Sequence, residues 1–156
     1  MIRRVFFSFD FDDVWIVNQI RHLDVLDIKS KFYDHANIEA IKRSNDIQIK
    51  NWIDEEMKGA SVTCVLIGKE TYKSKWVKYE IEQSYSLNKG LLGIYIHSFK
   101  NNQGMTSYTK GINPFPNFYK AKTYNPLEEC PYSTPYECVS DNINKWIEYA
   151  AKQVDR

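Results

Sequence analysis

One glutamate of this sequence stands where it could take part in catalysis. Glu80 follows Trp76 by four positions in the segment 75–88, whose apolar side chains recur at helical spacing. Residues four apart are neighbours on a helix surface, so the indole and the carboxylate would lie side by side. A carboxylate in such a place could stabilise positive charge that develops on a substrate. The alternative is an ordinary glutamate at the edge of the core, paired with a lysine.

Other catalytic signatures are missing from the sequence. It has no GxGxxG run after its first apolar segment, no GxxxxGK[ST] phosphate loop and no GxSxG nucleophile elbow. The three histidines, His22, His35 and His97, belong to no HExxH motif and to no cluster of carboxylates. We therefore expect neither a catalytic metal nor a bound redox cofactor.

The cysteines indicate thiols rather than a metal site. Cys64 falls in the apolar run 62–67 and is expected to be a small buried hydrophobic residue. Cys130 and Cys138 are eight positions apart in a proline- and tyrosine-rich segment, without the close pairing of a zinc site. We expect all three cysteines to be reduced.

Length and charge exclude several classes of protein. The chain has 156 residues, which is typical of one domain, so residues 1–156 are expected to fold as a single unit. Its 21 Lys and Arg against 20 Asp and Glu give a net charge of +1, which argues against a general nucleic-acid binder and a polybasic membrane patch. The chain also lacks a membrane-spanning apolar run and a secretory signal pattern, so a cytoplasmic protein is expected.

The apolar pattern predicts alternating strands and helices. Continuous apolar runs predict strands at residues 3–9, 61–67 and 91–96, with shorter strands at 31–34 and 121–124. Helical spacing predicts helices at 12–26, 46–58, 75–88 and 139–154, the first capped by Asp12 or Asp13. Residues 98–137 hold all five prolines and are expected to be mainly loop. This order indicates a three-layer α/β domain with a mostly parallel central sheet flanked by helices.

Ligands of such sheets bind beyond the carboxyl ends of the strands. That rule nominates residues 8–13, 68–73 and 97–100 as the borders of a site. His97 could touch a ligand there or merely end its strand. The neighbouring lysines could meet a pyrophosphate or could simply be solvated; they are Lys69, Lys73 and Lys75.

Five segments resemble, in order, the TIR-like proteins of the bacterial Thoeris anti-phage system. They are RVFFSF (4–9), SVTCVLIG (61–68), WVKYEI (76–81), LGIYIH (92–97) and KGINPF (110–115), within roughly residues 3–120. The resemblance implies a flavodoxin-like (TIR-like) fold and cleavage of NAD+, as substrate rather than cofactor, between nicotinamide and ribose. It also implies that Glu80 is the catalytic residue, since the family's W-V-x-x-E helix motif falls on Trp76, Val77 and Glu80.

The resemblance extends to the substrate pocket and the product. The family's loop after the first strand borders the nucleotide pocket, which here implies Ser8, Phe9, Asp10 and Asp13. The product would be a cyclic or conjugated ADP-ribose signal that activates a separate effector, in some relatives after an infection trigger. Loss of neutral nicotinamide leaves an oxocarbenium-like ribose, which a carboxylate can stabilise. Aromatic rings can hold the pyridinium by cation–π attraction, and the candidates are Phe6, Phe9 and Trp76.

Two other functions are compatible with the sequence. One is a non-catalytic TIR-like module that recruits partners, with residues 108–137 as its contact surface. In an enzyme the same segment could be a lid or a contact between copies in a homo-oligomer. The other is a flavodoxin-like response or electron-transfer domain, although the sequence lacks a phosphate-cradling loop after its first strand.

Overall fold

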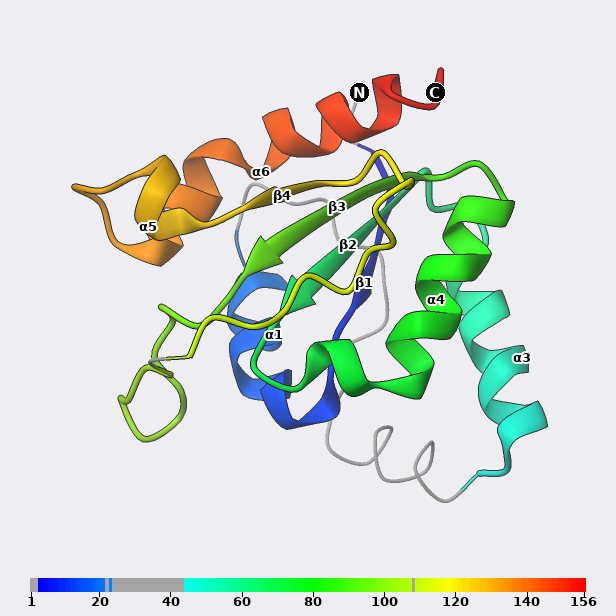
Figure 1. Cartoon of the computed structure of the whole chain (residues 1–156), viewed down its shortest axis with the longest axis horizontal. Coiled ribbons are helices and arrows are strands. Elements are labelled where there is room, and N and C mark those ends of the chain that lie inside the picture. Colours follow the sequence, from blue (N-terminus) through cyan, green and yellow to red (C-terminus); the bar gives the residue numbers. More distant parts are fainter. Residues whose placement is uncertain (1–2, 22, 24–43, 108) are drawn as a thin grey trace.

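The computed structural model describes residues 3–21, 23, 44–107 and 109–156 of the chain. Its described strands form one parallel sheet in the order β1-β2-β3-β4 (Figure 1). They are β1 (Val5–Ser8), β2 (Val62–Ile67), β3 (Gly90–Tyr95) and β4 (Lys122–Tyr124). Four of the predicted strands are thereby confirmed, and the strand predicted at 31–34 lies outside the described residues.

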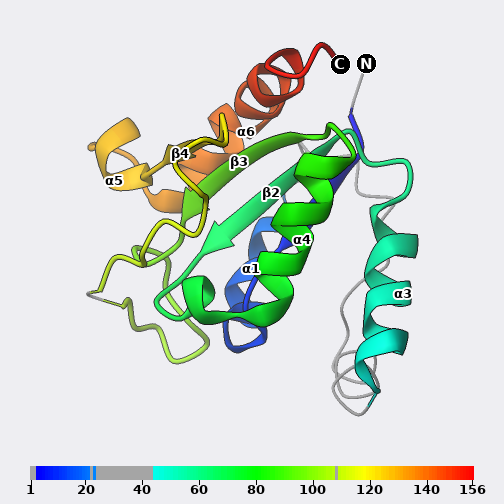
Figure 2. The same cartoon turned by 45° about the vertical axis from the view of Figure 1, so that its right-hand side comes forward.

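Helices cover both faces of this sheet. They are α1 (Val14–Arg21), α3 (Asp46–Met57), α4 (Lys75–Ser86), α5 (Pro126–Glu129) and α6 (Pro135–Lys152), with 3-10 turns η1 (Phe11–Asp13) and η2 (Thr71–Lys73) before α1 and α4. Residues of α1 and α6 share one apolar cluster with the sheet, whereas α3 and α4 lie together on the opposite side (Figures 1 and 2). The three-layer α/β fold is confirmed.

The strands bury apolar side chains on both of their faces. In β1, Phe7 packs in the cluster beneath α1 and α6, and its neighbour Phe6 packs against Ile53 and Met57 of α3. All residues of β2 and β3 are buried, as their continuous apolar runs predicted. Each fully buried side chain of this size contributes about 1.5–3 kcal/mol, so the sheet forms a rigid floor for residues at its edge.

Capping side chains set the starts of the two helices on the α3 side. Asn45 accepts a hydrogen bond from the Gln48 N–H at 2.9 Å, and the Gln48 side chain accepts one from the Asn45 N–H, so α3 begins with a capping box. Ser74 accepts a bond from the third residue of α4. Gly59 follows α3 with a φ of +78°, which glycine adopts without strain. The predicted helices 46–58 and 75–88 are confirmed.

The start of α1 differs from its prediction. Asp12 and Asp13 do not cap a helix; both belong to η1, which runs directly into α1 at Val14. The acidic run therefore winds into a turn beyond the end of β1, and this turn directs the Asp13 side chain toward Gly68 at the end of β2.

The expectation of three reduced cysteines is wrong for one pair. Cys130 and Cys138 form a disulfide, with their Cα atoms 5.7 Å apart. The described residues between 98 and 121 are mostly loop as predicted, but α6 begins at Pro135, and its first turn brings Cys138 back beside the end of α5. Cys64 is free and fully buried, as its apolar run indicated.

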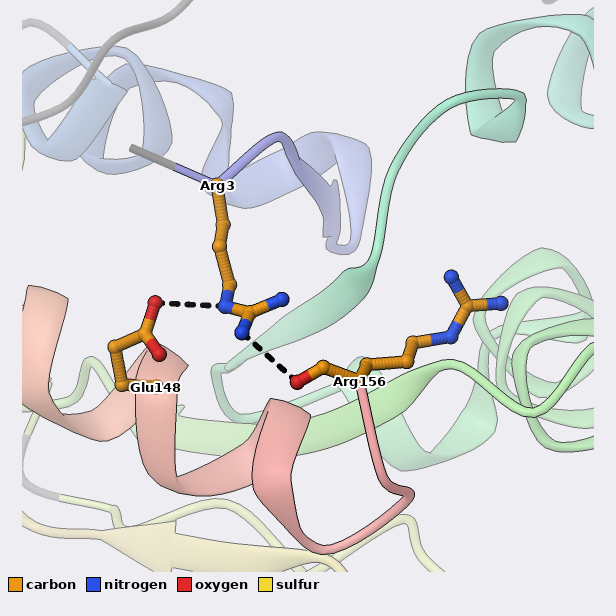
Figure 3. Close-up of polar contacts among 3 residues, drawn as sticks. All are labelled: Arg3, Glu148 and Arg156. Carbon is orange, nitrogen blue, oxygen red and sulfur yellow. Dashed lines mark hydrogen bonds and ion pairs between the residues drawn. The ribbon is translucent and has the colours of Figure 1, made fainter. Parts of the chain in front are cut away.

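The two ends of the described chain are joined by polar contacts. Arg3 donates from Nε to Glu148 of α6 at 2.6 Å and from Nη2 to the main-chain oxygen of Arg156 at 2.8 Å (Figure 3). The Arg156 guanidinium donates in turn to the carbonyl oxygens of Leu87 and Asn88. These bonds hold the start of β1 against the end of α6. Of the helices described, none combines the length and apolar character that crossing a bilayer requires.

Candidate active site

Glu80 lies on the buried side of α4. Its helix neighbours Val77 and Ile81 are buried against the sheet, and this orientation of α4 leaves Glu80 only 7% exposed. Its Oε2 atom has no hydrogen-bond partner among the described residues. Burial raises the pKa of Glu80 to about 8, because the charged form loses its hydration. The alternative, a glutamate at the edge of the core paired with a lysine, is wrong: Glu80 is buried and forms no ion pair with a lysine among the described residues.

Ser8, the last residue of β1, approaches Glu80 from the sheet. Its side chain is fully buried, and its hydroxyl favours the ionised carboxylate, which partly offsets the effect of burial on the Glu80 pKa. Neither Ser8 Oγ nor Glu80 Oε2 completes a well-formed hydrogen bond to a described residue. Buried polar atoms normally have partners, so these two oxygens are available to a ligand's hydroxyl groups.

Aromatic side chains enclose Glu80 in a small pocket. Its lining consists of Phe7, Phe9, Phe11, Ile49, Trp52, Ile53, Ser74, Trp76 and Glu80. The cavity volume is about 40 Å³. Since one water needs roughly 10–15 Å³, this space holds a few waters but no nicotinamide ring with its ribose. We call this the Glu80 pocket.

Helix α3 covers the Glu80 pocket and is held there by surface contacts with α4. It supplies the side chains of Ile49, Trp52 and Ile53 to the lining. The Tyr79 hydroxyl donates to Asp54 at 2.8 Å, and Lys75 forms an ion pair with Asp46. Exposed ion pairs contribute only about 0–1 kcal/mol each, so these polar contacts add little to the apolar packing of α3.

The predicted substrate-binding residues divide between different places. Phe9 and Trp76 line the Glu80 pocket, and Ser8 borders it. Phe6 lies in the core beneath α3 and is not part of the pocket lining. The other lining residues were not predicted as part of the site: Phe7, Phe11, Ile49, Trp52, Ile53 and Ser74. Trp52 lies in the predicted helix 46–58, at helical spacing from Ile49 and Ile53, but this spacing carries no information on what the apolar face of the helix covers.

Asp13 lines a second, larger cavity on the α1 side of the sheet edge. This cavity has a volume of about 360 Å³. Its lining consists of Asp12, Asp13, Val14, Trp15, Ile16, Gly68, Lys69, Ile96, His97, Phe99, Asn101, Asn102, Met105 and Ser107. The three segments nominated from the ends of the strands therefore do meet, but at this cavity rather than at the Glu80 pocket. We call it the Asp13 cavity.

Two titratable groups of the Asp13 cavity have shifted pKa values. Burial, reinforced by the charges of Asp10 and Asp12, raises the pKa of Asp13 to about 7. Burial and the nearby Lys110 lower the pKa of His97. Asp10 itself has a raised pKa, through burial and the charges of Asp12 and Glu70. Within the part of the chain that the structure describes, no group of three or more His, Cys, Asp and Glu side chains could hold a metal ion.

Comparisons with known proteins place the chain in a family. The sequence profile of the family described as "Thoeris protein ThsB, TIR-like domain" matches residues 6–101, which include most of β1, all of α4 and most of the lining of both cavities. A Bacillus cereus (strain MSX-D12) protein named "Putative cyclic ADP-D-ribose synthase ThsB1" is 38% identical over 120 residues, which cover 74% of this chain and 62% of the relative. The chain thus matches about three fifths of that relative's length.

Proposed function

Because this chain belongs to the TIR-like domain family of the Thoeris protein ThsB, we propose that it consumes NAD+ in bacterial anti-phage defence. The product is a cyclic ADP-ribose isomer or a related ADP-ribose signal, which diffuses through the cytoplasm to a separate effector. The printed name of the Bacillus cereus relative, a cyclic ADP-D-ribose synthase, supports this class of reaction. The observation that carries the proposal is the buried Glu80 carboxyl group, with an unpartnered oxygen, opposite Ser8.

In the proposed reaction the bond between nicotinamide N1 and ribose C1′ breaks. Both bonding electrons leave with nicotinamide, which becomes neutral, and C1′ acquires oxocarbenium character as in glycoside hydrolysis. The Glu80 carboxylate stabilises this positive charge and accepts hydrogen bonds from the ribose hydroxyls, while the Ser8 hydroxyl donates or accepts a hydrogen bond there. A nucleophile from the adenosine half, or a water, then bonds to C1′ and loses its proton to solvent.

The raised pKa of Glu80 is compatible with this role. With a pKa of about 8 the carboxyl group is mostly protonated at neutral pH in the empty pocket. A pyridinium ring brings a positive charge beside it, and an opposite charge within about 4–6 Å lowers the pKa of a carboxyl group. Substrate binding therefore favours the ionised form that the reaction uses. Phe9 and Trp76 offer aromatic faces to the same cation.

NAD+ can enter the Glu80 pocket only if α3 moves. The volume of about 40 Å³ is far below the roughly 300–1,000 Å³ of typical ligand pockets. The bonds from Asp46 and Asp54 to α4 lie at the surface, where breaking them costs little. Movement of α3 after an infection trigger would therefore switch the enzyme on.

Nicotinamide release from NAD+ tests the proposal. The full chain and its Glu80→Gln variant are incubated with NAD+ in lysates of infected and uninfected cells, and nicotinamide is quantified by chromatography. We expect release by the wild type in at least one condition and its loss in Glu80→Gln. Glu82→Gln is the matched control, because Glu82 lies on the exposed side of the same helix. Equal release by wild type and Glu80→Gln in both conditions would contradict the proposal.

An exposed aromatic cluster favours a second function, recruitment of a partner or another copy of the chain. Tyr85 of α4 stacks on Tyr119 with ring centres 4.0 Å apart, and both rings contact Phe118, which is 72% exposed. These residues include part of the segment 108–137 discussed as a contact surface. Light scattering of the wild type and Phe118→Ser tests self-association; a monomer in both would rule out recruitment of another copy through this cluster.

A further inference from the structure

The Asp13 cavity is not used by the reaction proposed above. The reaction is built on residues of β1, α3 and α4, whereas this cavity is lined by η1, α1 and the loop that follows β3. Its volume of about 360 Å³ lies within the range of roughly 300–1,000 Å³ found for small-molecule sites. It is therefore large enough to bind a ligand of its own.

Two residues that line this cavity each have a buried polar atom without a partner among the described residues. One is Oδ2 of Asp13, and the other is Nδ1 of His97, a side chain that is only 9% exposed. They come from segments that follow different strands. Leaving a buried polar atom unpaired costs about 1–3 kcal/mol, so a ligand that bonds to both atoms recovers this free energy.

The chain makes room for the Asp13 carboxyl group at the edge of the sheet. A Cβ atom on Gly68 would lie 2.2 Å from Asp13 Oδ2, so with any other residue at position 68 the Asp13 carboxyl group would have to move. Asp13 can lie there only because residue 68 is glycine. The carboxyl group is thus held against the end of β2 as part of a built site, and does not merely project from a surface loop.

The walls of the cavity fit a flat ring with polar edges. Trp15 is 41% exposed and Met105 is 59% exposed, so both present apolar surface to the opening. Asn101 and Asn102 add amide groups that both donate and accept hydrogen bonds. Indole faces stack well on heteroaromatic rings, and edge amides pair with the mixed donors and acceptors of such rings.

The charges around the cavity disfavour an anionic ligand. Asp10 and Asp12 lie close enough to Asp13 to raise its pKa, and Glu70 does the same for Asp10. Lys69 is the cation in the lining, and Lys110 lies near enough to His97 to lower its pKa. Glu70 is paired with Lys73, so the negative excess in the lining itself comes from Asp12 and Asp13 against Lys69. This excess repels a phosphate group but not an uncharged ring.

We propose that the Asp13 cavity binds an uncharged purine base or its nucleoside. The ring lies against Trp15, and its edge forms hydrogen bonds with Asp13 and His97. A protonated Asp13 donates to a ring nitrogen and an ionised one accepts from an amino group, so either form can bind such an edge. This site is separate from the Glu80 pocket and does not depend on cleavage of NAD+.

Calorimetric titration of the full chain tests the proposal, with adenine, adenosine and AMP as probes. The titrations use the Glu80→Gln variant, which is expected not to cleave NAD+. Binding measured in it therefore does not depend on that reaction. We expect saturable binding of adenine and adenosine, and binding of AMP weakened about tenfold by the acidic surroundings. Absence of saturable binding by all three probes would overturn the proposal, and AMP binding as tightly as adenosine would overturn the ligand class.

Second variants separate binding from folding. Asp13→Asn, His97→Gln and Trp15→Ala, added to Glu80→Gln, should each weaken adenosine binding about tenfold with far-ultraviolet circular dichroism unchanged. Asp141→Asn, an exposed carboxylate of α6, is the matched control and should leave binding unchanged. Adenosine affinity that survives all three cavity substitutions would place the ligand elsewhere and overturn the assignment.

Discussion

The Glu80 pocket and the Asp13 cavity lie on opposite sides of the same sheet edge. Each contains a partly or fully buried carboxyl group with a raised pKa and one unpartnered oxygen. They differ in volume, about 40 Å³ against about 360 Å³, and in what surrounds the carboxyl group. Aromatic rings and one hydroxyl surround Glu80, whereas other acids and an imidazole accompany Asp13.

This difference shows that a raised pKa does not by itself identify a catalytic group. For Glu80 burial alone raises the pKa, so a cationic substrate can lower it again on binding. For Asp13 the charges of Asp10 and Asp12 add to burial, and a neutral ligand leaves them in place. The first arrangement fits stabilisation of developing positive charge, and the second fits recognition of an uncharged ring.

The largest expected effect is a difference in nicotinamide release between variants of the two carboxyl groups. Under conditions in which the wild type releases nicotinamide, Glu80→Gln should lower the rate about 10²–10³-fold, because a neutral amide cannot stabilise the oxocarbenium charge. Asp13→Asn should change the rate by no more than about threefold, as expected for a site outside the reaction. Nicotinamide release measured by chromatography checks both. Comparable losses in the two variants would mean that the cavities act as one site.

Loss of the Ser8 hydroxyl should have a smaller effect, seen most clearly in the pH dependence. Ser8→Ala should lower the rate about tenfold, because one hydrogen bond to a charged group is lost. Ser8 lowers the pKa of Glu80, so its removal should move the acid limb of the pH–rate profile to higher pH. Ser86→Ala, at the exposed end of α4, is the control. An unshifted acid limb would show that Ser8 does not act on Glu80.

Much of the arrangement at the carboxyl edge of the sheet could be predicted from the sequence, because the carboxyl ends of parallel strands lie at the same edge. The segments 8–13, 68–73 and 97–100 were nominated on that basis and come together at the Asp13 cavity. The pairing of Trp76 with Glu80 followed from helical spacing. Both predictions depend on regular geometry that repeats with a fixed period along the chain.

The division of the edge into two sites could not be predicted. Ser8 still belongs to β1 and approaches Glu80 of α4, whereas Asp13 is the last residue of η1 and lies against Gly68. The direction of that turn depends on tertiary packing. The position of α3 over Glu80 and the Cys130–Cys138 disulfide could not be predicted for the same reason. They depend on contacts between segments that no local pattern connects.

Loosening α3 should raise activity modestly and leave the Asp13 cavity unchanged. Asp54→Asn weakens the bond that Asp54 accepts from Tyr79, and since an exposed contact contributes up to about 1 kcal/mol, nicotinamide release should rise up to about fivefold. Lys58→Ala is the matched control, because the Lys58–Glu55 pair also involves α3 but does not reach α4. Adenosine titration should give the same affinity in both variants. A decrease in release by Asp54→Asn, or an equal rise in Lys58→Ala, would contradict the covering role of α3.

The last effect concerns stability rather than activity, and it distinguishes the two carboxyl groups by pH. A carboxyl group with a higher pKa in the folded than in the unfolded protein destabilises the fold as pH rises from the unfolded through the folded pKa. For Glu80 this interval runs from 4.5 to about 8, and for Asp13 from 3.8 to about 7.

Glu80→Gln and Asp13→Asn should therefore melt at the same temperature as the wild type near pH 4 and at higher temperatures near neutrality, by roughly 2–4 °C for each kcal/mol removed. Between about pH 7 and 8 the difference should keep growing for Glu80→Gln and stay level for Asp13→Asn, because only Glu80 still titrates there. Melting curves followed by circular dichroism check this. Differences that do not vary with pH would show that the substitutions act through packing, and that neither carboxyl group keeps its proton in the folded protein.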